Sequence, residues 1–584
     1  MGKGSLIGLL VIIIAITIAA NSFKGDYGNT GNNVVIHELD DPGNLNPTNY
    51  SGASSGYIIE LLYEPLLGTD MKTLEIIPIL AESLPKIEVY ADTFIALHYK
   101  IREEAKWPDG KPITGYDVAF SLKVIKNPHV DAPRLRPYFE MLDSIYINPD
   151  NPKEFTLFSS QKYMDLLEIS GGFYVLPEHI LDPEGLMRPF GLKVLTHHPE
   201  RVRDDERLRK FAERYNEIKR DTMLLRGSGP YVITKLETDQ EIVLRRNHNW
   251  WADALPEDKK NMFLVAYPER ITRKIINDFT TMEVALMGRQ IDVASPLPKQ
   301  YVKFKHTKAI TKYFNLYDTT SLAYTFIGLN MKNPKLSDVR VRKALAHLIN
   351  KDVIIKNFLH GLGTPVIGPI HPALKKFYND TITPYEYNPE KAKQLLKEAG
   401  WEDTDGDGIL DKEIDGTRVP FIISYIYNTG NDIRKNIGLL FQEEARKVGI
   451  KVIIQQLDWS VFLEKLDQRD FETCALGWIG GTRPSDPKQI WHTESYYADG
   501  GDNFVGFGNA YTDSLIEAIR TELDEDKRAE LWKLFQVEIH KQVPYIFLYA
   551  PKGLRTISKR FDAYVSIARP GYNVREFKLK SPEL

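Results

Sequence analysis

The chain begins with an apolar run and turns to mixed polar and apolar patterns only afterwards. Residues 6–20 contain no charged side chain, a single lysine precedes them, and a polar stretch rich in Gly and Asn follows. This order is typical of an export signal, and the run is short for a membrane-spanning helix. Residues 1–32 are therefore predicted to form an export signal or an N-terminal membrane anchor with a flexible stretch. Either one places the remaining chain outside the cytoplasm.

From Val34 to about residue 291, strand-like segments alternate with a few helices. TFIALHYKI and FTLFSS alternate as strands do, while GYDVAFSLKVI has helical spacing. SSGYIIELLYEPLLG also has helical spacing, and Gly68 is expected to end that helix. Between His197 and Leu224 the apolar residues recur as in a solvated surface helix. His197 and His198 resemble a metal-ligand pair, but adjacent residues of a helix point to different faces.

After residue 291 the pattern changes to regular alternation of helices and strands. YNPEKAKQLLKEAGW has Asn388 as an expected N-cap, Pro389 at the first helical position and Gly400 just past the end. Ser337 or Asp338 caps the next candidate helix, and Asp524 is the expected cap of a long one. Helices alternating with strands predict an α/β lobe with a partly parallel sheet.

Composition narrows the function classes but does not select one. The 584 residues are 43% hydrophobic, which is enough for several cores. The net charge of −4 gives no reason to expect a nucleic-acid partner. The single cysteine, Cys474, excludes an intrachain disulfide. Aromatic residues make up 11% of the chain, which suits either a binding cleft or a large aromatic core.

The sequence lacks the local motifs of several common enzyme classes. It contains no G-x-S-x-G elbow, no H-E-x-x-H zinc motif and no G-x-x-x-x-G-K-[ST] phosphate loop. GFGNAY and GLGTPV both depart from the dinucleotide pattern at its third glycine. We therefore expect a binding protein without enzymatic activity and without an obligatory cofactor.

One acidic stretch has the spacing of a calcium loop. In DTDGDGILDKE the carboxylates alternate and a glycine allows the sharp turn, as calcium loops require. The twelfth position is Ile414 instead of a bidentate Glu, so an acidic turn is the other interpretation. If the loop binds a structural calcium ion, the candidate ligands are Asp403, Asp405, Asp407 and Asp411.

Five segments, in order, resemble the extracytoplasmic solute-binding proteins of the oligopeptide/dipeptide ABC-transporter family (solute-binding protein family 5). The resemblance extends over nearly the whole chain after the export segment, from about residue 34 to 575. The segments are AKWPDGKPITGYDVAFSL, GSGPYVITKLETDQEIVLRRNHNWW, FIGLNMKNPKLSDVRVRKALAHLINKDVII, YNPEKAKQLLKEAGW and NFVGFGNAYTDSLI.

The resemblance implies an α/β fold of the periplasmic-binding-protein type II, with two lobes that close like a clamp and an extra subdomain on the first. The first lobe is expected at 34–58, 176–291 and 551–584, the subdomain at 59–175, and the second lobe at 292–550. It further implies a monomer that captures short peptides between the lobes and delivers them to the permease of an ABC importer. Three alternatives stay open: a non-peptide ligand (an oligosaccharide, another small organic solute or a metal chelate), a membrane-tethered ligand sensor, and an exported enzyme on the same scaffold, against which the missing motifs argue.

The resemblance also indicates ligand-binding positions. Relatives carry an Asp three residues after a Gly-Trp step, where it holds the peptide ammonium; here Gly481 occupies that place and Asp486 is the next acid. Gly480 and Gly481 are also consistent with a tight turn that needs positive φ, and each aromatic position with ordinary core packing. The expected ligand-binding set is Ser51, Ala53, Trp459, Trp478, Gly480, Gly481, Asp486, Trp491 and Asn503.

Overall fold

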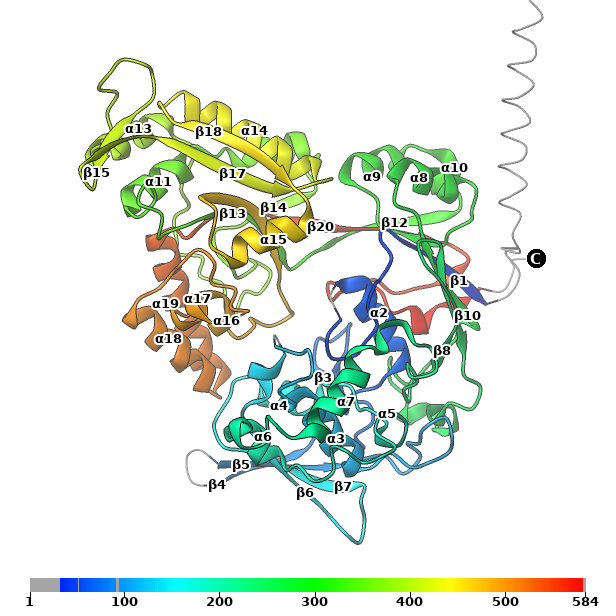
Figure 1. Cartoon of the computed structure of the whole chain (residues 1–584). Coiled ribbons are helices and arrows are strands. Elements are labelled where there is room, and N and C mark those ends of the chain that lie inside the picture. Colours follow the sequence, from blue (N-terminus) through cyan, green and yellow to red (C-terminus); the bar gives the residue numbers. More distant parts are fainter. Residues whose placement is uncertain (1–31, 51, 91–93, 134, 499, 581–584) are drawn as a thin grey trace, which may run out of the picture.

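The computed structural model describes residues 32–50, 52–90, 94–133, 135–498 and 500–580, so residues 1–31 of the predicted export segment lie outside it. Within the described ranges, no helix combines the length and the apolar character needed to cross a membrane. The chain folds into two α/β lobes, and one long strand, β20 (Tyr545–Ser558), runs from one to the other (Figure 1).

β20 holds a 12-stranded sheet together because its two halves pair with different strands. Its first half pairs antiparallel with β13 (Ala323–Leu329), and its second half with β12 (Phe314–Thr320) and β11 (Val293–Ala294). The strand order is β18-β17-β19-β13-β20-β11-β1-β10-β9-β8. The other strands of this order are β1 (Asn33–Glu38), β8 (Tyr231–Glu237), β9 (Glu241–Arg246), β10 (Arg270–Ile275), β17 (Ile422–Asn428), β18 (Lys451–Leu457) and β19 (Thr473–Ile479).

The second lobe contains the partly parallel sheet that the sequence predicts. β17 pairs parallel with both β18 and β19, so the loops after these strands lie at one edge of the sheet. Helices cover both faces, and each face has its own buried cluster, one around Phe441 and one around Phe535. The helices are α11 (Val339–His347), α13 (Pro389–Glu398), α14 (Asp432–Arg446), α15 (Trp459–Asp467), α18 (Ala510–Thr521) and α19 (Glu525–Gln542).

The first lobe and the subdomain share one continuous core. A four-stranded antiparallel sheet, in the order β4-β5-β7-β6, forms the subdomain together with α3 (Gly115–Lys126). The same buried cluster contains Ile36 of β1 and Leu97 of β5. It also takes in α7 (Glu206–Asn216), whose Phe211 packs edge-on against Phe120 of α3 at 5.8 Å. The strands are β4 (Lys86–Tyr90), β5 (Phe94–Lys100), β6 (Leu142–Ile147) and β7 (Glu154–Ser159).

The segment just after residue 291 packs with the first lobe. A separate buried cluster joins Leu286 of α8 (Phe279–Met287), Phe304 of α9 (Pro298–Lys305) and Phe314 at the start of β12, and Val35 of β1 packs against it. In Figure 1 these helices stand beside β12 and β1, away from the helices of the second lobe. The chain therefore passes between the lobes through β12 and β13, later than the expected boundary at residue 292.

Helix ends follow local rules at several predicted positions. The Asn388 side chain accepts a hydrogen bond from the Lys391 amide, Pro389 is the first helical residue, and Gly400 follows the end with φ of +83°. Asp338 and Asp524 cap α11 and α19 as expected. These caps satisfy backbone N–H groups that the first helical turn leaves without a partner.

Gly68 does not end a helix, contrary to the sequence-based expectation. The helix α2 (Ala53–Leu62) ends before Glu64 and Pro65, because the residue before a proline is disfavoured in helical conformation. Gly68 instead lies in the short strand β2 (Leu67–Thr69), where a Cβ would meet the Ile79 side chain at 2.6 Å.

Two glycines of the GSGPY segment allow a close approach to the end of α2. A Cβ on Gly227 would lie 2.2 Å from the carbonyl oxygen of Leu62 and 2.6 Å from the ring of Tyr63. A Cβ on Gly229 would lie 2.6 Å from the carbonyl oxygen of Leu61. Both contacts involve backbone that cannot move without displacing α2, which lines the cavity described below.

Gly227→Ala is expected to lower the free energy of unfolding by about 1–3 kcal/mol, the range typical of overpacking. Urea unfolding followed by circular dichroism measures this change. Gly191→Ala is the matched control, because a Cβ there meets nothing within 4 Å. Equal stability of the two variants would contradict the close packing of Gly227 on α2.

Candidate ligand-binding cleft

A cavity of about 630 Å³ lies where the first lobe, the subdomain and the second lobe meet. Its volume is within the range of sites that enclose small molecules and short peptides. The first lobe contributes the end of α2 and the segment 567–575, the subdomain contributes Tyr138 and residues between Tyr163 and Tyr174, and the second lobe contributes Leu322 and residues 479–486. We call this the interlobe cavity.

The second-lobe wall is the loop that leaves the carboxyl end of β19. The Gly480 amide donates to the carbonyl of Leu322, at the crossing between β12 and β13, at 3.1 Å. A Cβ on Gly480 would lie 2.5 Å from that oxygen, so only glycine fits. Neither Gly480 nor Gly481 has positive φ, and the tight-turn interpretation is therefore wrong. At Gly480, the requirement for glycine comes instead from the close approach to the crossing segment.

Asp486 reaches the cavity, but its carboxylate is already engaged. Its Oδ2 accepts hydrogen bonds from the Tyr163 hydroxyl at 2.9 Å and from Arg520 Nε at 2.8 Å. Its Oδ1 accepts the Lys488 amide at 2.8 Å. The residue is only 8% exposed. With one oxygen used by two donors and the other by a third, Asp486 has little capacity left for a ligand ammonium.

The subdomain wall carries two carboxylates that are not engaged. Asp165 precedes the short helix α4 (Leu166–Gly171) but makes no capping hydrogen bond, and Glu168 lies one turn further on. Within the described part of the chain, neither carboxylate has an ion-pair or hydrogen-bond partner. Burial, with the nearby charges of Glu168 and Asp486, raises the pKa of Asp165 to about 7. Burial also raises the pKa of Glu168.

The first-lobe wall buries a second set of charged groups. Glu64 accepts the indole N–H groups of Trp250 at 3.2 Å and Trp251 at 2.8 Å, and burial raises its pKa to about 7. The Arg575 guanidinium donates to the carbonyls of Phe263 at 2.7 Å and of Glu60. The Glu60 carboxyl opens into the cavity, yet protein surrounds it closely enough that burial raises its pKa.

Several predicted positions lie away from this cavity. Trp491 is buried against Phe507 at 5.3 Å and Tyr545 at 4.8 Å, so it is a core residue of the second lobe. Asn503 is fully buried, and its amide nitrogen donates to the carbonyls of His492 and Phe507, which explains it as a loop anchor.

The other predicted positions are placed as follows. Trp478 lies in β19 with its indole N–H donating to the Tyr545 hydroxyl at 3.3 Å, and it does not line the cavity. Trp459, at the start of α15, is 50% exposed and stacks on Phe462. Ala53 is exposed at the first turn of α2. Ser51 lies outside the described residues.

Sequence reasoning did not single out four charged residues of the cavity that make no ion pair within the described chain. Asp165 and Glu168 belong to no recognisable motif, and Arg483 and Arg569 lie in irregular loops. One signal was present: Arg483 and Asp486 both lie in the loop that follows the Gly-Trp step. Their roles depend on partners from other elements, which spacing along the chain does not contain.

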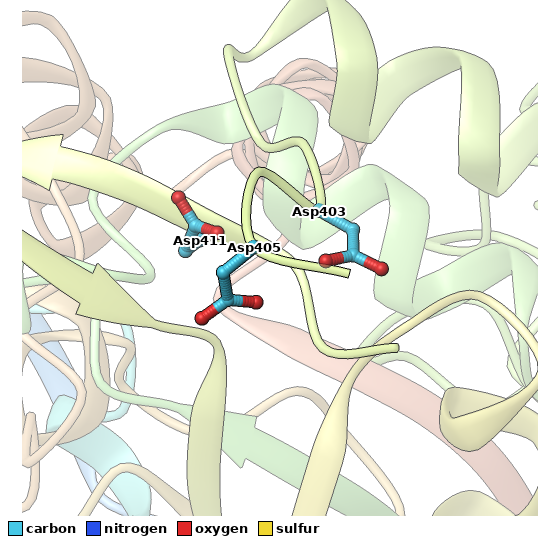
Figure 2. Close-up of side chains that lie close together, drawn as sticks. All are labelled: Asp403, Asp405 and Asp411. Atoms are coloured by element: carbon cyan, nitrogen blue, oxygen red, sulfur yellow. The ribbon is translucent and has the colours of Figure 1, made fainter. Parts of the chain in front are cut away.

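The acidic loop between α13 and β15 (Asp411–Ile414) brings three of its four candidate ligands together (Figure 2). Oxygens of Asp403, Asp405 and Asp411 lie within 4.8 Å of one another, while Asp407 is not part of this group. Asp403 also accepts the amides of Gly406 and Gly408. Asp411 is paired with Arg418. Oxygen donors at this spacing fit a calcium ion, and a bound ion would compete with Arg418 for Asp411. Calcium binding stays a prediction.

His197 and His198 each lie beside a different carboxylate. His197 lies 3.1 Å from Asp143, and His198 lies 3.5 Å from Glu200. The two rings thus have different partners. The continuous surface helix expected between His197 and Leu224 is not formed: α6 (Leu192–His197) ends before His198, and α7 begins only at Glu206 and buries its apolar side.

Comparison with known proteins identifies relatives along most of the chain. The chain is 29% identical over 555 residues to the oligopeptide-binding protein AppA of Bacillus subtilis, covering 94% of this chain and 92% of AppA. It is 26% identical over 591 residues to the dipeptide-binding protein of Escherichia coli, covering 96% of each.

The solved structures agree in fold. AppA from Bacillus subtilis in complex with a nonapeptide superposes with a TM-score of 0.75 at 27% identity, covering 94% of this chain and 99% of AppA. NikZ from Campylobacter jejuni in complex with Ni(L-His) superposes with a TM-score of 0.73 at 21% identity, covering 94% of this chain and all of NikZ, and this likeness concerns the fold alone. The two-lobed clamp expected from the sequence is confirmed.

The family model for bacterial extracellular solute-binding proteins, family 5, matches residues 75–500, which is more than half of the chain. Members of this family are extracytoplasmic and bind solutes. The match agrees with the resemblance seen in the five sequence segments. The chain therefore belongs to the bacterial extracellular solute-binding proteins of family 5.

Proposed function

We propose that this protein is the substrate-binding component of an ABC importer and that it captures short peptides in the interlobe cavity. The names of its relatives, an oligopeptide-binding and a dipeptide-binding protein, support peptides as the ligand class. The absence of common enzyme motifs and the family membership support binding without chemical conversion of the ligand.

The distribution of unpaired charges in the cavity is the observation that carries this proposal. Asp165 and Glu168 line one wall, while Arg483 and Arg569 line others. Within the described chain none of the four makes an ion pair or a side-chain hydrogen bond, although the Arg483 charge offsets part of the rise in the pKa of both carboxyl groups. A free-ended peptide presents an ammonium at one end and a carboxylate at the other, so it can complement both kinds of charge. We assign the ammonium to Asp165 and Glu168, in place of an acid at Gly481.

Closure of the two lobes is expected because a ligand in the cavity would contact both of them. A ligand that contacts both lobes has a higher affinity for the closed state than for the open one, and this difference shifts the population toward closure. The closed, loaded form would then be presented to the permease. Residues 1–32 would export the protein and, if uncleaved, tether it to the outer face of the cytoplasmic membrane, with the folded part acting as a monomer.

A non-peptide solute is the second candidate. The exposed aliphatic side chain of Ile479, which lines the cavity, would contact the apolar part of a sugar or an organic chelate as well as that of a peptide side chain. The ligand's charge requirements separate these possibilities.

A synthetic library of short peptides with free termini is expected to bind at least about ten-fold more tightly than the same library after N-acetylation, because an ion-paired hydrogen bond is lost. Isothermal titration calorimetry on the folded part of the chain measures this difference. Equal affinity of the two libraries would contradict the assigned ammonium site, and no binding of either would contradict the peptide ligand.

The pH dependence of the peptide affinity provides a control for the assignment of the ammonium to Asp165 and Glu168. Asp165 has a pKa of about 7 without ligand, and an ammonium favours its ionised form, so affinity should fall as pH drops below 7. Affinity should also fall above about pH 8, where a peptide α-amino group loses its proton. Asp165→Asn should remove most of the acid limb without lowering the melting temperature, since it removes a desolvated carboxylate. Acetylated peptides should lack both limbs.

For the acidic loop, calcium added to chelator-treated protein is expected to raise the melting temperature with concentration, because the ion binds only the folded loop. Asp405→Asn should abolish the shift. Asp407→Asn is the matched control, since Asp407 lies outside the group of three. An unchanged melting temperature in millimolar calcium would show that the loop is only an acidic turn.

A further inference from the structure

Two hydrogen bonds join the subdomain to the second lobe beside the interlobe cavity. The Tyr163 hydroxyl donates to Asp486 Oδ2 at 2.9 Å, and the Met164 amide donates to the carbonyl of Arg520 at 2.7 Å. Tyr163 and Met164 follow β7 of the subdomain, whereas Asp486 and Arg520 belong to the second lobe. Both bonds therefore require the two parts to be close together.

The side chains at this contact are removed from water. Tyr163 is 3% exposed. Met164 packs against two core clusters: the one shared by the first lobe and the subdomain, and one of the second lobe. Burial and the Asp486 charge raise the pKa of the Tyr163 hydroxyl, so it keeps its proton and remains a donor at neutral pH. A hydrogen bond to a charged acceptor in such a place is stronger than one at the surface.

The second lobe holds the acceptor in position. Arg520 Nε donates to the same Asp486 oxygen at 2.8 Å, and Arg520 also pairs with Glu517 at 2.9 Å. The guanidinium lies over the Tyr163 ring at 5.7 Å. Asp486 thus stays in one orientation whether or not Tyr163 is present, and the Tyr163 hydroxyl completes a site that the second lobe has already built.

This contact also helps to position the loop from Gly480 to Asp486, which forms the second-lobe wall of the cavity. The loop from Gly480 to Asp486 is fastened at one end by the Gly480–Leu322 hydrogen bond and at the other by Asp486. Between these ends, Gly481 and Arg483 line the cavity. Attaching Asp486 to the subdomain therefore places the loop against the cavity and closes the gap between the lobes at this side.

We propose that Tyr163 and Met164 form an interlobe latch with Asp486 and Arg520, in which Tyr163 is a positioning residue that stabilises the closed state. This deepens the proposed solute-binding function and rests on it. The latch raises ligand affinity by increasing the closed fraction, because apparent affinity scales with the population of the binding-competent state. In this latch Asp486 stabilises the contact between the subdomain and the second lobe, and it does not bind the ammonium group of the ligand.

The test measures the distance between the lobes in ligand-stripped protein, by double electron–electron resonance between spin labels at Glu213→Cys and Glu390→Cys. Both positions are exposed, and the native Cys474 is buried and does not interfere with labelling. Tyr163→Phe removes only the hydroxyl. It should reduce the ratio of closed to open protein by roughly ten-fold, the effect of one hydrogen bond to a charged group, with an unchanged melting temperature.

Tyr146→Phe is the matched control, because Tyr146 is an exposed tyrosine of the same subdomain. It should leave the distance distribution as in the wild type. Amide exchange at Met164 provides a second readout, and Tyr163→Phe should accelerate it by a similar factor. If Tyr163→Phe folds poorly, Met164→Ala tests the same contact through its packing between the two cores.

An unchanged distance distribution in Tyr163→Phe would overturn the latch. So would a wild-type protein that is fully open without ligand, since the contact would then not hold the lobes by itself. Neither result depends on what the ligand is. Failure of the peptide assignment in calorimetry would therefore leave the latch result intact, and failure of the latch would leave the peptide assignment intact.

Discussion

The backbone pairing of β20 is the constraint on which the rest of the structure depends. Its residues Tyr545 to Ala550 are buried in the second lobe, while its later residues pair with β12 and β11 in the first. Between them, Pro551 to Gly553 are only half-buried. Because one sheet continues through both lobes, this short stretch and the crossing between β12 and β13 are the connections through which one lobe is placed relative to the other.

The interlobe cavity lies next to this crossing, and its second-lobe wall is attached to it. Gly480 contacts Leu322 so closely that no side chain fits, and the loop is thereby held against the crossing segment. The other end of the loop meets the subdomain at Tyr163. The loop therefore contacts the crossing segment at one end and the subdomain at the other, with Asp165 and Glu168 on the facing wall of the cavity.

Features determined by neighbours in sequence were predictable, and those determined by distant partners were not. Asn388, Pro389 and Gly400 define a helix through backbone rules that act within a few residues. By the same kind of local rule, Gly68 looks like a glycine that ends a helix. The helix ends earlier because of Pro65, and Gly68 lies in β2 in contact with Ile79. Trp491 is matched to a cleft position by proximity along the chain, but its surroundings are assembled from β20 and from α19.

The cavity's charge pattern illustrates the same limit. Whether a carboxylate is free to bind depends on what else reaches it. Asp486 meets Tyr163 and Arg520, which lie 323 and 34 residues away along the chain, respectively. Asp165, with no motif around it, meets no partner within the described residues. Family resemblance was sufficient for the fold and the class of protein, whereas the charged groups that line the cavity are brought together by contacts between distant parts of the chain.

Native mass spectrometry of gently purified protein, followed by release of whatever it carries, tests the central claim that the cavity binds peptides. We predict several bound masses that differ by amino-acid residue masses and whose fragments read as peptides with free N-termini. A single bound mass that fragments as a sugar, an organic solute or a metal chelate would contradict the peptide assignment.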